Sequence, residues 1–232
     1  MVGHTFQPFN HHEKVKVYRR NLPHWRQDGC TYFVTFRLAD SIPAPVLRQW
    51  KHERTQWLIA HGIQGSLRNK DEMNRYLALP QKERSAFERQ QARRLHTELD
   101  QCHGSCLLRN SEVQLLVRSA LTFFDGTRLA CGDGVIMPNH VHWLVLPYPD
   151  HSLETIMKSI KSYLSNQVSK LLSKQGKLWQ PESYDRLVRN RRELDAFRRY
   201  IAENPGHAGL SNSRCTSWKS RWLDRNLSEE PM

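Results

Sequence analysis

The run "GVIMPNHVHWLVLP", residues 134–147, constrains the fold most, because it reads as the end of one apolar strand, a Pro-Asn turn signal and a second apolar strand. With "TRLACGDGVIM" as its first arm, it predicts an antiparallel hairpin. Side chains alternate along a strand, so His140 and His142 share one face while Trp143 takes the other. A strand built for a core therefore carries two neighbouring imidazoles, which need a chemical explanation.

Strands and helices alternate along the rest of the chain. Apolar spacing, capping signatures and turn residues predict, in order, a strand at 31–38, a charged helical segment at about 44–105, a helix from Ser111 to about Gly126, the hairpin, a helix capped by Ser152, a short strand "YDRLV", and a helix capped by Asn190 and stopped at Pro205. Without the charged segment this is the order of a ferredoxin-like split βαβ domain. The predicted fold class is α+β, an antiparallel sheet with helices on one face plus a helical insertion.

The same pattern divides the chain into parts. We expect a basic N-terminal lead-in at 1–30, one main domain at 31–210 that contains the insertion, and a basic, Trp-containing tail at 211–232. For the insertion we favour a solvated helical hairpin without chemistry, and its basic surface leaves contact with a nucleic-acid backbone open.

The charge balance points to a polyanionic partner. Lys and Arg total 35 against 23 Asp and Glu, a formal net charge of +12, which favours nucleic acid. No long apolar run exists, so we expect no membrane association. The N-terminus lacks the apolar stretch of a signal peptide and the five cysteines are scattered, which favours a reducing cytosol. The segment "CHGSC" lacks a second Cys/His pair at zinc-finger spacing.

The paired histidines favour a metal site over a purely structural role only when further ligands join them. Two neutral imidazoles can chelate a divalent cation. On the following helix, Tyr163 and Gln167 stand four residues apart on one flank of the apolar stripe. A cation held by His140, His142 and Gln167 would polarise a scissile phosphate for attack by Tyr163, and Mg²⁺ or Mn²⁺ suits such mixed ligands. Asn166 is the alternative to Gln167.

These residues carry a family resemblance. "MPNHVH" followed by an apolar strand resembles the HUH motif of single-tyrosine (Y1) transposases. The opening "YRRNLPHWRQDGCTYFVTFRL" and the segment "YIAENPGHAGL" resemble REP-associated tyrosine transposases, relatives of the IS200/IS605 group. The resemblance covers most of the chain.

The resemblance implies a metal-dependent single-stranded DNA endonuclease and strand transferase that acts on REP-like hairpins. It assigns His140 and His142 as metal ligands, Gln167 as the third ligand and Tyr163 as the nucleophile that forms a 5′-phosphotyrosine. It also implies a cytoplasmic, nucleoid-associated bacterial protein. It leaves open a monomer or a homodimer, and whether Tyr163 completes the site of its own chain or that of a partner. The alternative is a non-catalytic ferredoxin-like nucleic-acid-binding protein, an inactive or domesticated transposase. A metallohydrolase using activated water is disfavoured because an acidic ligand set is lacking.

Basic residues interleaved with aromatic ones form the predicted DNA surface. They are Arg19, Arg20, Trp25, Arg26, Lys158, Lys161, Arg186, Arg189, Arg191, Arg192, Trp218, Lys219 and Trp222.

Overall fold

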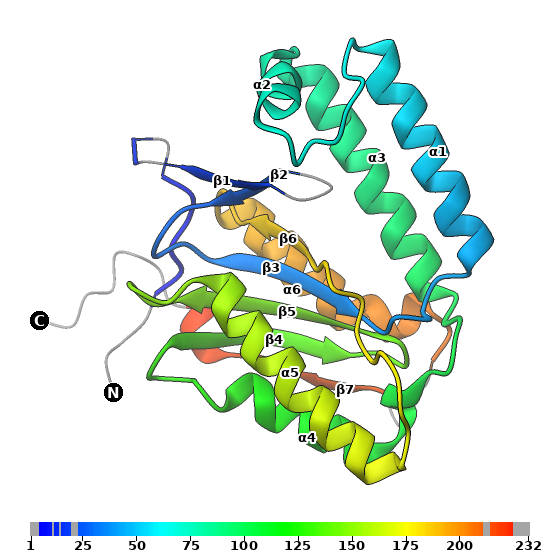
Figure 1. Ribbon diagram of the computed structural model, residues 1–232. Helices are drawn as coiled ribbons and strands as arrows, with labels where there is room; N and C mark the ends of the chain where they lie inside the picture. The colour runs from blue at the N-terminus through cyan, green and yellow to red at the C-terminus, as the bar shows by residue number, and fades with distance from the viewer. Residues whose placement is uncertain (1–4, 11, 14, 20–22, 211–213, 225–232) are drawn as a thin grey trace, which may run out of the picture.

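The computed structural model describes residues 5–10, 12, 13, 15–19, 23–210 and 214–224. Its centre is a five-stranded sheet with the strand order β6-β3-β5-β4-β7, in which all the pairings are antiparallel (Figure 1). The strands are β3 (Tyr32–Arg37), β4 (Leu129–Ile136), β5 (His140–Pro147), β6 (Tyr184–Leu187) and β7 (Thr216–Trp218). The antiparallel sheet and the hairpin of β4 and β5 are therefore confirmed.

Helices cover both faces of this sheet. Helices α4 (Ser111–Thr122) and α5 (Leu153–Leu172) bury their apolar stripes against Val34, Trp143 and Val145. Helix α6 (Arg191–His207) packs on the opposite face, with Phe33 and Leu144. The sequence predicted helices on one face of the sheet. Helices α4 and α5 lie together on one face as predicted, but α6 covers the other face, which corrects the prediction for that helix. None of the described helices is both long and apolar enough to cross a bilayer.

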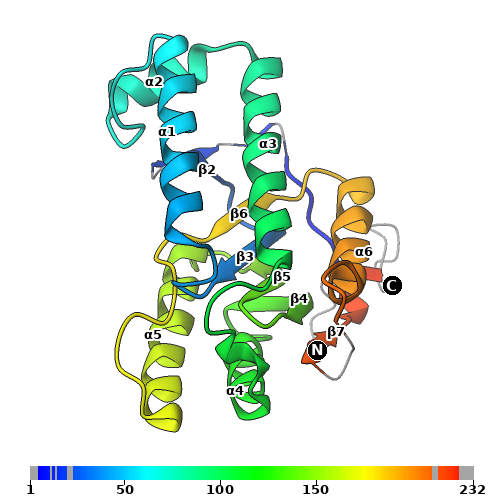
Figure 2. The same ribbon diagram turned by 90° about the vertical axis from the view of Figure 1, so that its right-hand side faces the viewer.

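The charged segment forms three helices that project from one side of the sheet (Figures 1 and 2). They are α1 (Ala44–Ala60), α2 (Lys70–Ala78) and α3 (Gln81–Asp100), and the 3-10 turn η1 (Leu107–Arg109) leads from them to α4. A small core of their own, with Met73 and Tyr76 fully buried and Trp57 stacked on Phe87, holds their outer ends together. The inner end of α3 reaches the sheet, so the insertion is more than a solvated hairpin.

Described residues near both ends of the chain pack onto the domain. Strands β1 (Lys16–Arg19) and β2 (Pro23–Arg26) pair as a separate ribbon, and Phe6 is buried with α6. In the tail, β7 adds the fifth strand to β4 and the 3-10 turn η3 (Arg221–Asp224) follows it. A three-residue strand is too short to show a period, which is why the sequence did not predict β7.

Local capping is largely as expected. The Ser152 side chain accepts a hydrogen bond from the Thr155 amide at 3.2 Å, and Asn190 accepts one from the Glu193 amide at 2.9 Å. Helix α4 is capped by Asn110 rather than by Ser111. Helix α6 does not stop at Pro205 but continues to His207, because a proline near a helix end removes only one backbone donor.

Candidate active site

His140 and His142 lie fully buried on the sheet face that α6 covers. Their Nε2 atoms are 2.9 Å apart. Each ring is fixed by its other nitrogen, since His140 Nδ1 is 2.7 Å from Asn139 Oδ1 and His142 Nδ1 is 2.7 Å from Thr35 Oγ1. Asn139 in turn donates from Nδ2 to the His103 carbonyl oxygen at 3.2 Å. Side-chain partners of this kind orient metal-ligating histidines.

Burial keeps both imidazoles neutral. It lowers the pKa of His140 to about 3; the nearby His96 adds to this effect and the Asn204 side chain opposes it. It also lowers the pKa of His142 well below its usual value, with His140 and His96 contributing. Because the amide oxygen of Asn139 can only accept, His140 carries its proton on Nδ1 and presents a lone pair on Nε2. The pair is thus in the protonation state that binds cations.

Helix α6 brings a tyrosine and an amide to these histidines. The Tyr200 hydroxyl lies 3.3 Å from His142 Nε2. One helical turn later, Asn204 donates from Nδ2 to the Tyr200 hydroxyl at 3.2 Å and to Asp100 Oδ1 at 3.0 Å. The other amide atom, Asn204 Oδ1, is buried and has no hydrogen-bond partner among the described residues. Burial, with a contribution from Asp100, raises the pKa of Tyr200.

The insertion contributes His96 to the same cluster. Its ring stacks on that of Tyr200, with centroids 5.3 Å apart and an interplanar angle of 25°, and meets the His142 ring edge-on at 5.3 Å. The ring of Tyr184 completes its surroundings at 5.4 Å. Burial lowers the pKa of His96 to about 4, and its Nε2 has no partner within the described part of the chain. Helix α3 thereby closes the site from the side opposite the sheet.

The donor set fits a divalent cation. Two imidazole nitrogens converge, and the unpaired amide oxygen of Asn204 lies one helical turn after Tyr200. Among the described residues no third histidine, cysteine or carboxylate stands with His140 and His142 in a metal-holding group. An imidazole pair with one neutral oxygen leaves positions open for a substrate.

Tyr163 and Gln167 do not join this site within one chain, which corrects their predicted place. Both stand on α5, whose buried stripe packs against the sheet face opposite to the histidines. Tyr163 is 47% exposed to solvent. The prediction failed because a helix wheel gives the side chains of one flank but not the face of the sheet against which the helix packs.

Several of the predicted DNA-contacting cations are occupied by protein partners. Arg26 forms ion pairs with Glu154 and Asp185, which also gives a structural role to Asp185. Lys161 donates to Ser183 Oγ at 2.7 Å and to the carbonyl oxygen of Gln180 at 2.9 Å. The remaining two are Arg186, paired with Glu193 at 2.5 Å, and Arg191, paired with Asp195 at 3.0 Å.

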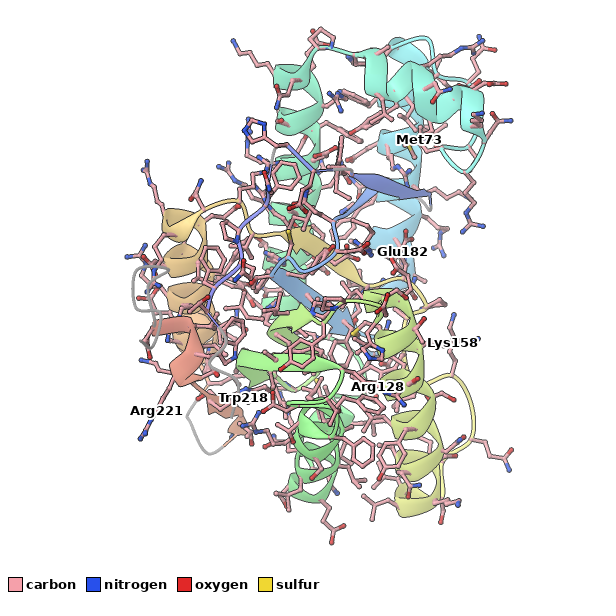
Figure 3. The ribbon with its side chains drawn as sticks, turned by 90° about the vertical axis from the view of Figure 1, so that its left-hand side faces the viewer. Met73, Arg128, Lys158, Glu182, Trp218 and Arg221 are labelled. Carbon is pink, nitrogen blue, oxygen red and sulfur yellow. The ribbon has the colours of Figure 1, made fainter. Side chains whose placement is uncertain are left out.

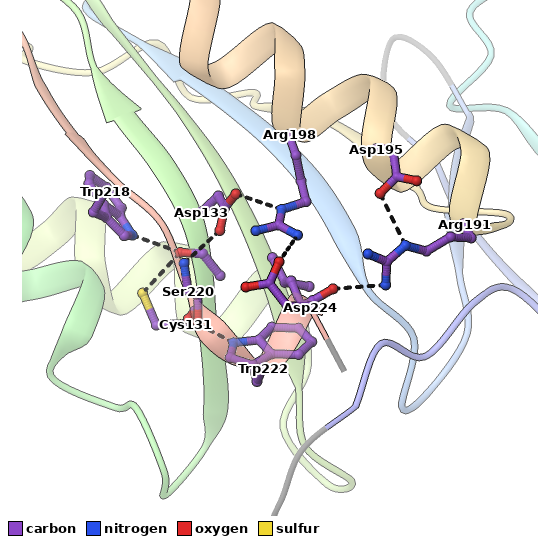
Figure 4. Close-up of polar contacts among 11 residues, drawn as sticks. Cys131, Asp133, Arg191, Asp195, Arg198, Trp218, Ser220, Trp222 and Asp224 are labelled. Atoms are coloured by element: carbon purple, nitrogen blue, oxygen red, sulfur yellow. Dashed lines mark hydrogen bonds and ion pairs between the residues drawn. The ribbon is translucent and has the colours of Figure 1, made fainter. Parts of the chain in front are cut away.

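The two tail tryptophans are also structural (Figure 4). Trp218 donates from its indole nitrogen to the Gly132 carbonyl oxygen at 2.7 Å, and Trp222 donates to that of Cys131 at 2.9 Å. Both indole nitrogens therefore bond to the sheet, which corrects the prediction that these two tryptophans belong to the DNA surface.

The other predicted contacts have different positions. Lys158 projects from α5 (Figure 3) and is exposed, as are Arg189, Arg192 and Lys219. Trp25 lines a cleft described below. The Arg19 side chain and the whole of Arg20 lie outside the described residues.

Tyr200 and Asn204 are the site residues that the sequence reasoning missed. The sequence predicted a helix that carries Leu194, Phe197, Tyr200 and Ile201, but no chemical role was assigned to Tyr200. The available signal was a tyrosine and an amide four residues apart on the buried side of a helix, where neither packing nor solvation requires them.

Comparison with known proteins places the site in a family segment. Residues 126–204 match the family model "Transposase IS200 like", which spans β4, β5, α5, β6 and α6 as far as Asn204. This segment is 79 of the 232 residues. It confirms the resemblance to IS200-like transposases for the part of the chain that holds the histidine pair and both tyrosines.

The other comparisons add little. No curated protein matches the chain. A solved structure described as the REP-associated tyrosine transposase bound to a REP hairpin is 14% identical, with 85% of this chain and 76% of that chain covered and a TM-score of 0.43. A similarity of this size assigns neither a function nor a ligand to the present chain.

Proposed function

We propose that this chain, whose residues 126–204 match the IS200-like transposases, is a metal-dependent single-stranded DNA endonuclease and strand transferase. Its substrate class is DNA that carries an imperfect, REP-like hairpin. The nucleophile is Tyr200, in place of the predicted Tyr163. The assignment replaces one tyrosine by another and keeps His140 and His142 as metal ligands.

One observation carries the proposal: a tyrosine hydroxyl lies within 3.3 Å of one of two buried, neutral imidazoles whose Nε2 atoms converge. A purely structural cluster would pair each polar atom. Here Asn204 Oδ1 and His96 Nε2 are buried without partners among the described residues, and an unpaired buried polar atom costs about 1–3 kcal/mol. A bound ligand would supply the missing partners of these two atoms and so remove this cost.

The proposed step is a phosphoryl transfer to Tyr200. Its Oη forms a bond to phosphorus, and the bond from phosphorus to the 3′ oxygen breaks, leaving a free 3′-OH and a 5′-phosphotyrosine. The phenol loses one proton and the departing 3′ oxygen gains one. Because the number of phosphate ester bonds does not change, attack by a 3′-OH on the phosphotyrosine reverses the step and joins strands.

The surroundings of Tyr200 define what the cation must supply. Burial raises the pKa of the phenol, so without help Tyr200 is protonated and a poor nucleophile. A Mg²⁺ or Mn²⁺ ion held by His140, His142 and the Asn204 oxygen would favour the phenolate and polarise the phosphate. The hydrogen bond from Asn204 and the stacked ring of His96 fix the direction of the hydroxyl.

The test is a covalent trapping experiment. The protein is incubated with a single-stranded hairpin oligonucleotide and Mn²⁺, and a denaturation-resistant protein-DNA band is measured. We expect the wild type and Tyr163→Phe to form it and Tyr200→Phe to lose it. Chelation with EDTA should remove it in every case. If Tyr200→Phe forms the adduct and Tyr163→Phe does not, the nucleophile is Tyr163 on α5.

A binding protein without catalysis is the competing function. It predicts that the wild type retains the hairpin oligonucleotide in a mobility-shift assay but forms no adduct under any metal. Binding together with adduct formation excludes this alternative, and binding without an adduct would replace our proposal by it.

A further inference from the structure

A cleft of about 1000 Å³ separates the helical insertion from the sheet. Its lining residues come from α1, α3, β2 and β6 and from the segment between α1 and α2. The sequence reasoning gave the insertion no chemistry, and the matched family segment begins only at residue 126. The cleft is therefore built partly from a region to which no role is assigned.

Within the described part of the chain, two arginines on its wall, Arg37 and Arg54, form no ion pair with a carboxylate, although Glu182 lies near enough to Arg54 to affect its charge. Arg37 is 8% exposed and donates to two neutral oxygens, Ser41 Oγ at 3.0 Å and the Leu38 carbonyl oxygen at 3.4 Å. Burial lowers its pKa to about 10. Arg54 on α1 keeps a buried Nε without a partner among the described residues, and burial lowers its pKa although Glu182 acts in the opposite direction. Buried cations without partners attract an anion.

The rest of the lining suits a phosphodiester chain rather than a small anion. Lys51, Arg84 and Arg189 add positive charge along the walls, and Trp25 and Trp50 offer partly exposed indole rings. The lining also holds three carboxylates, of which Asp185 is ion-paired with Arg26 and Glu88 accepts from the Tyr76 hydroxyl, so the basic residues remain in excess. Cations that follow a backbone and aromatic rings on which bases stack are the two components of single-strand binding sites. A volume of about 1000 Å³ lies at the upper end of the range for sites that enclose a drug-sized ligand, which gives room for a few nucleotides but not for a duplex.

The cleft and the candidate active site adjoin at Tyr184. Tyr184 lines the cleft and touches His96, whose ring lies against His142 and Tyr200. Arg37 stands directly opposite His140 in the pairing of β3 with β5. A strand whose phosphate reacts at Tyr200 therefore has its next nucleotides beside the cleft.

We propose that this cleft binds the single-stranded DNA next to the scissile phosphate, with Arg54 and Arg37 holding backbone phosphates and Trp50 and Trp25 stacking bases. The insertion is then a substrate-binding element. The inference rests on the proposed function for the identity of the strand, but the binding site itself needs no catalysis.

The experiment measures binding and not cleavage. Fluorescence anisotropy is recorded with Tyr200→Phe as the background, using a labelled hairpin with a single-stranded extension and the same hairpin without it. Arg54→Gln is compared with Arg48→Gln, an exposed arginine on α1 that does not line the cleft. We expect Arg54→Gln to weaken binding of the extended hairpin about tenfold, and the slope of log K against log salt to fall by about 0.7, as for one lost single-strand phosphate contact. Binding of the blunt hairpin should stay unchanged in both variants.

Three results would overturn the proposal. They are equal weakening by Arg54→Gln and Arg48→Gln, equal weakening for the blunt and the extended hairpin, and tighter binding of a single-stranded RNA of the same sequence, which would make RNA the occupant. If the extension effect holds while no covalent adduct forms on the wild type, the cleft assignment stands and the nuclease function fails. If an adduct forms and the extension effect is absent, the nuclease function stands and the cleft assignment fails.

Discussion

Single side chains around the histidines decide whether the site can hold a cation. The Thr35 hydroxyl lies 2.7 Å from His142 Nδ1 and fixes the direction of that ring. We expect Thr35→Val to weaken Mn²⁺ binding about 10- to 100-fold, the range found when such supporting partners are removed. Mn²⁺ affinity of the DNA-free protein, measured by electron paramagnetic resonance, checks this.

Two variants separate orientation from stability. Thr35→Ser keeps the hydroxyl and should keep most of the affinity. Thr31→Val removes another fully buried hydroxyl next to the same strand and should leave Mn²⁺ binding unchanged. If Thr31→Val weakens Mn²⁺ binding as strongly as Thr35→Val, the hydroxyl does not act through His142.

The sequence predicted the residues whose position depends on local geometry alone. Strand alternation placed His140 and His142 on one face, and they are there. It did not select Tyr200 over Tyr163, because each has an amide side chain four residues later on its own helix. Choosing between them requires the face of the sheet on which each helix packs, which is a long-range property.

Among helices and strands, too, the sequence predicted what depends on neighbouring residues and missed what depends on distant contacts. The boundaries of β5 and the caps Ser152 and Asn190 follow from side chains within a few residues, and the sequence predicted them. The tail was predicted to contribute to the DNA surface because aromatic and basic residues alternate in it. Their indole nitrogens instead bond to carbonyl oxygens at the bulge of β4, where the register shift turns backbone groups toward the tail.

The attachment of β7 depends on the absence of a side chain at Gly134. A Cβ there would lie 2.2 Å from Cζ2 of Trp218, whose ring also stacks on the Arg118 guanidinium at 3.9 Å. We expect Gly134→Ala to displace Trp218 and lower the free energy of unfolding by about 1–3 kcal/mol. The midpoint of urea denaturation measures the change. Gly206→Ala, at an open helical position, should raise the free energy of unfolding by about 0.5–1 kcal/mol. The two alanine substitutions should therefore shift the midpoint in opposite directions.

At the scale of the whole molecule, the site forms where distant parts of the chain meet. Helix α3 brings His96 and Asp100, β5 brings the histidines, and α6 brings Tyr200 and Asn204. No pattern within one segment indicates such a meeting. The charge of the insertion predicted exposed helices correctly for its outer surface but carried no sign that the inner end of α3 closes a site.

The contact of Asp100 on α3 with Asn204 on α6 can be tested by substitution. Its Oδ1 accepts from Asn204 Nδ2 at 3.0 Å, which holds the amide with its oxygen unpaired and free for a cation. Without this acceptor the amide can rotate and present nitrogen instead, so we expect Asp100→Ala to weaken Mn²⁺ binding and adduct formation about tenfold, as for a lost supporting partner. Hairpin binding should not change, because Asp100 contacts no predicted DNA surface.

The variants Asp100→Asn and Glu98→Ala make the cause specific. Asparagine keeps an oxygen acceptor without the charge and should retain most of the Mn²⁺ affinity. Glu98, near the end of the same helix, lies 3.4 Å from His103 and away from Asn204, so its loss should leave that affinity unchanged. If Asp100→Asn falls as far as Asp100→Ala, the charge of Asp100 and not its hold on the amide supports the site. The insertion would then act on the cation through its field rather than through the orientation of Asn204.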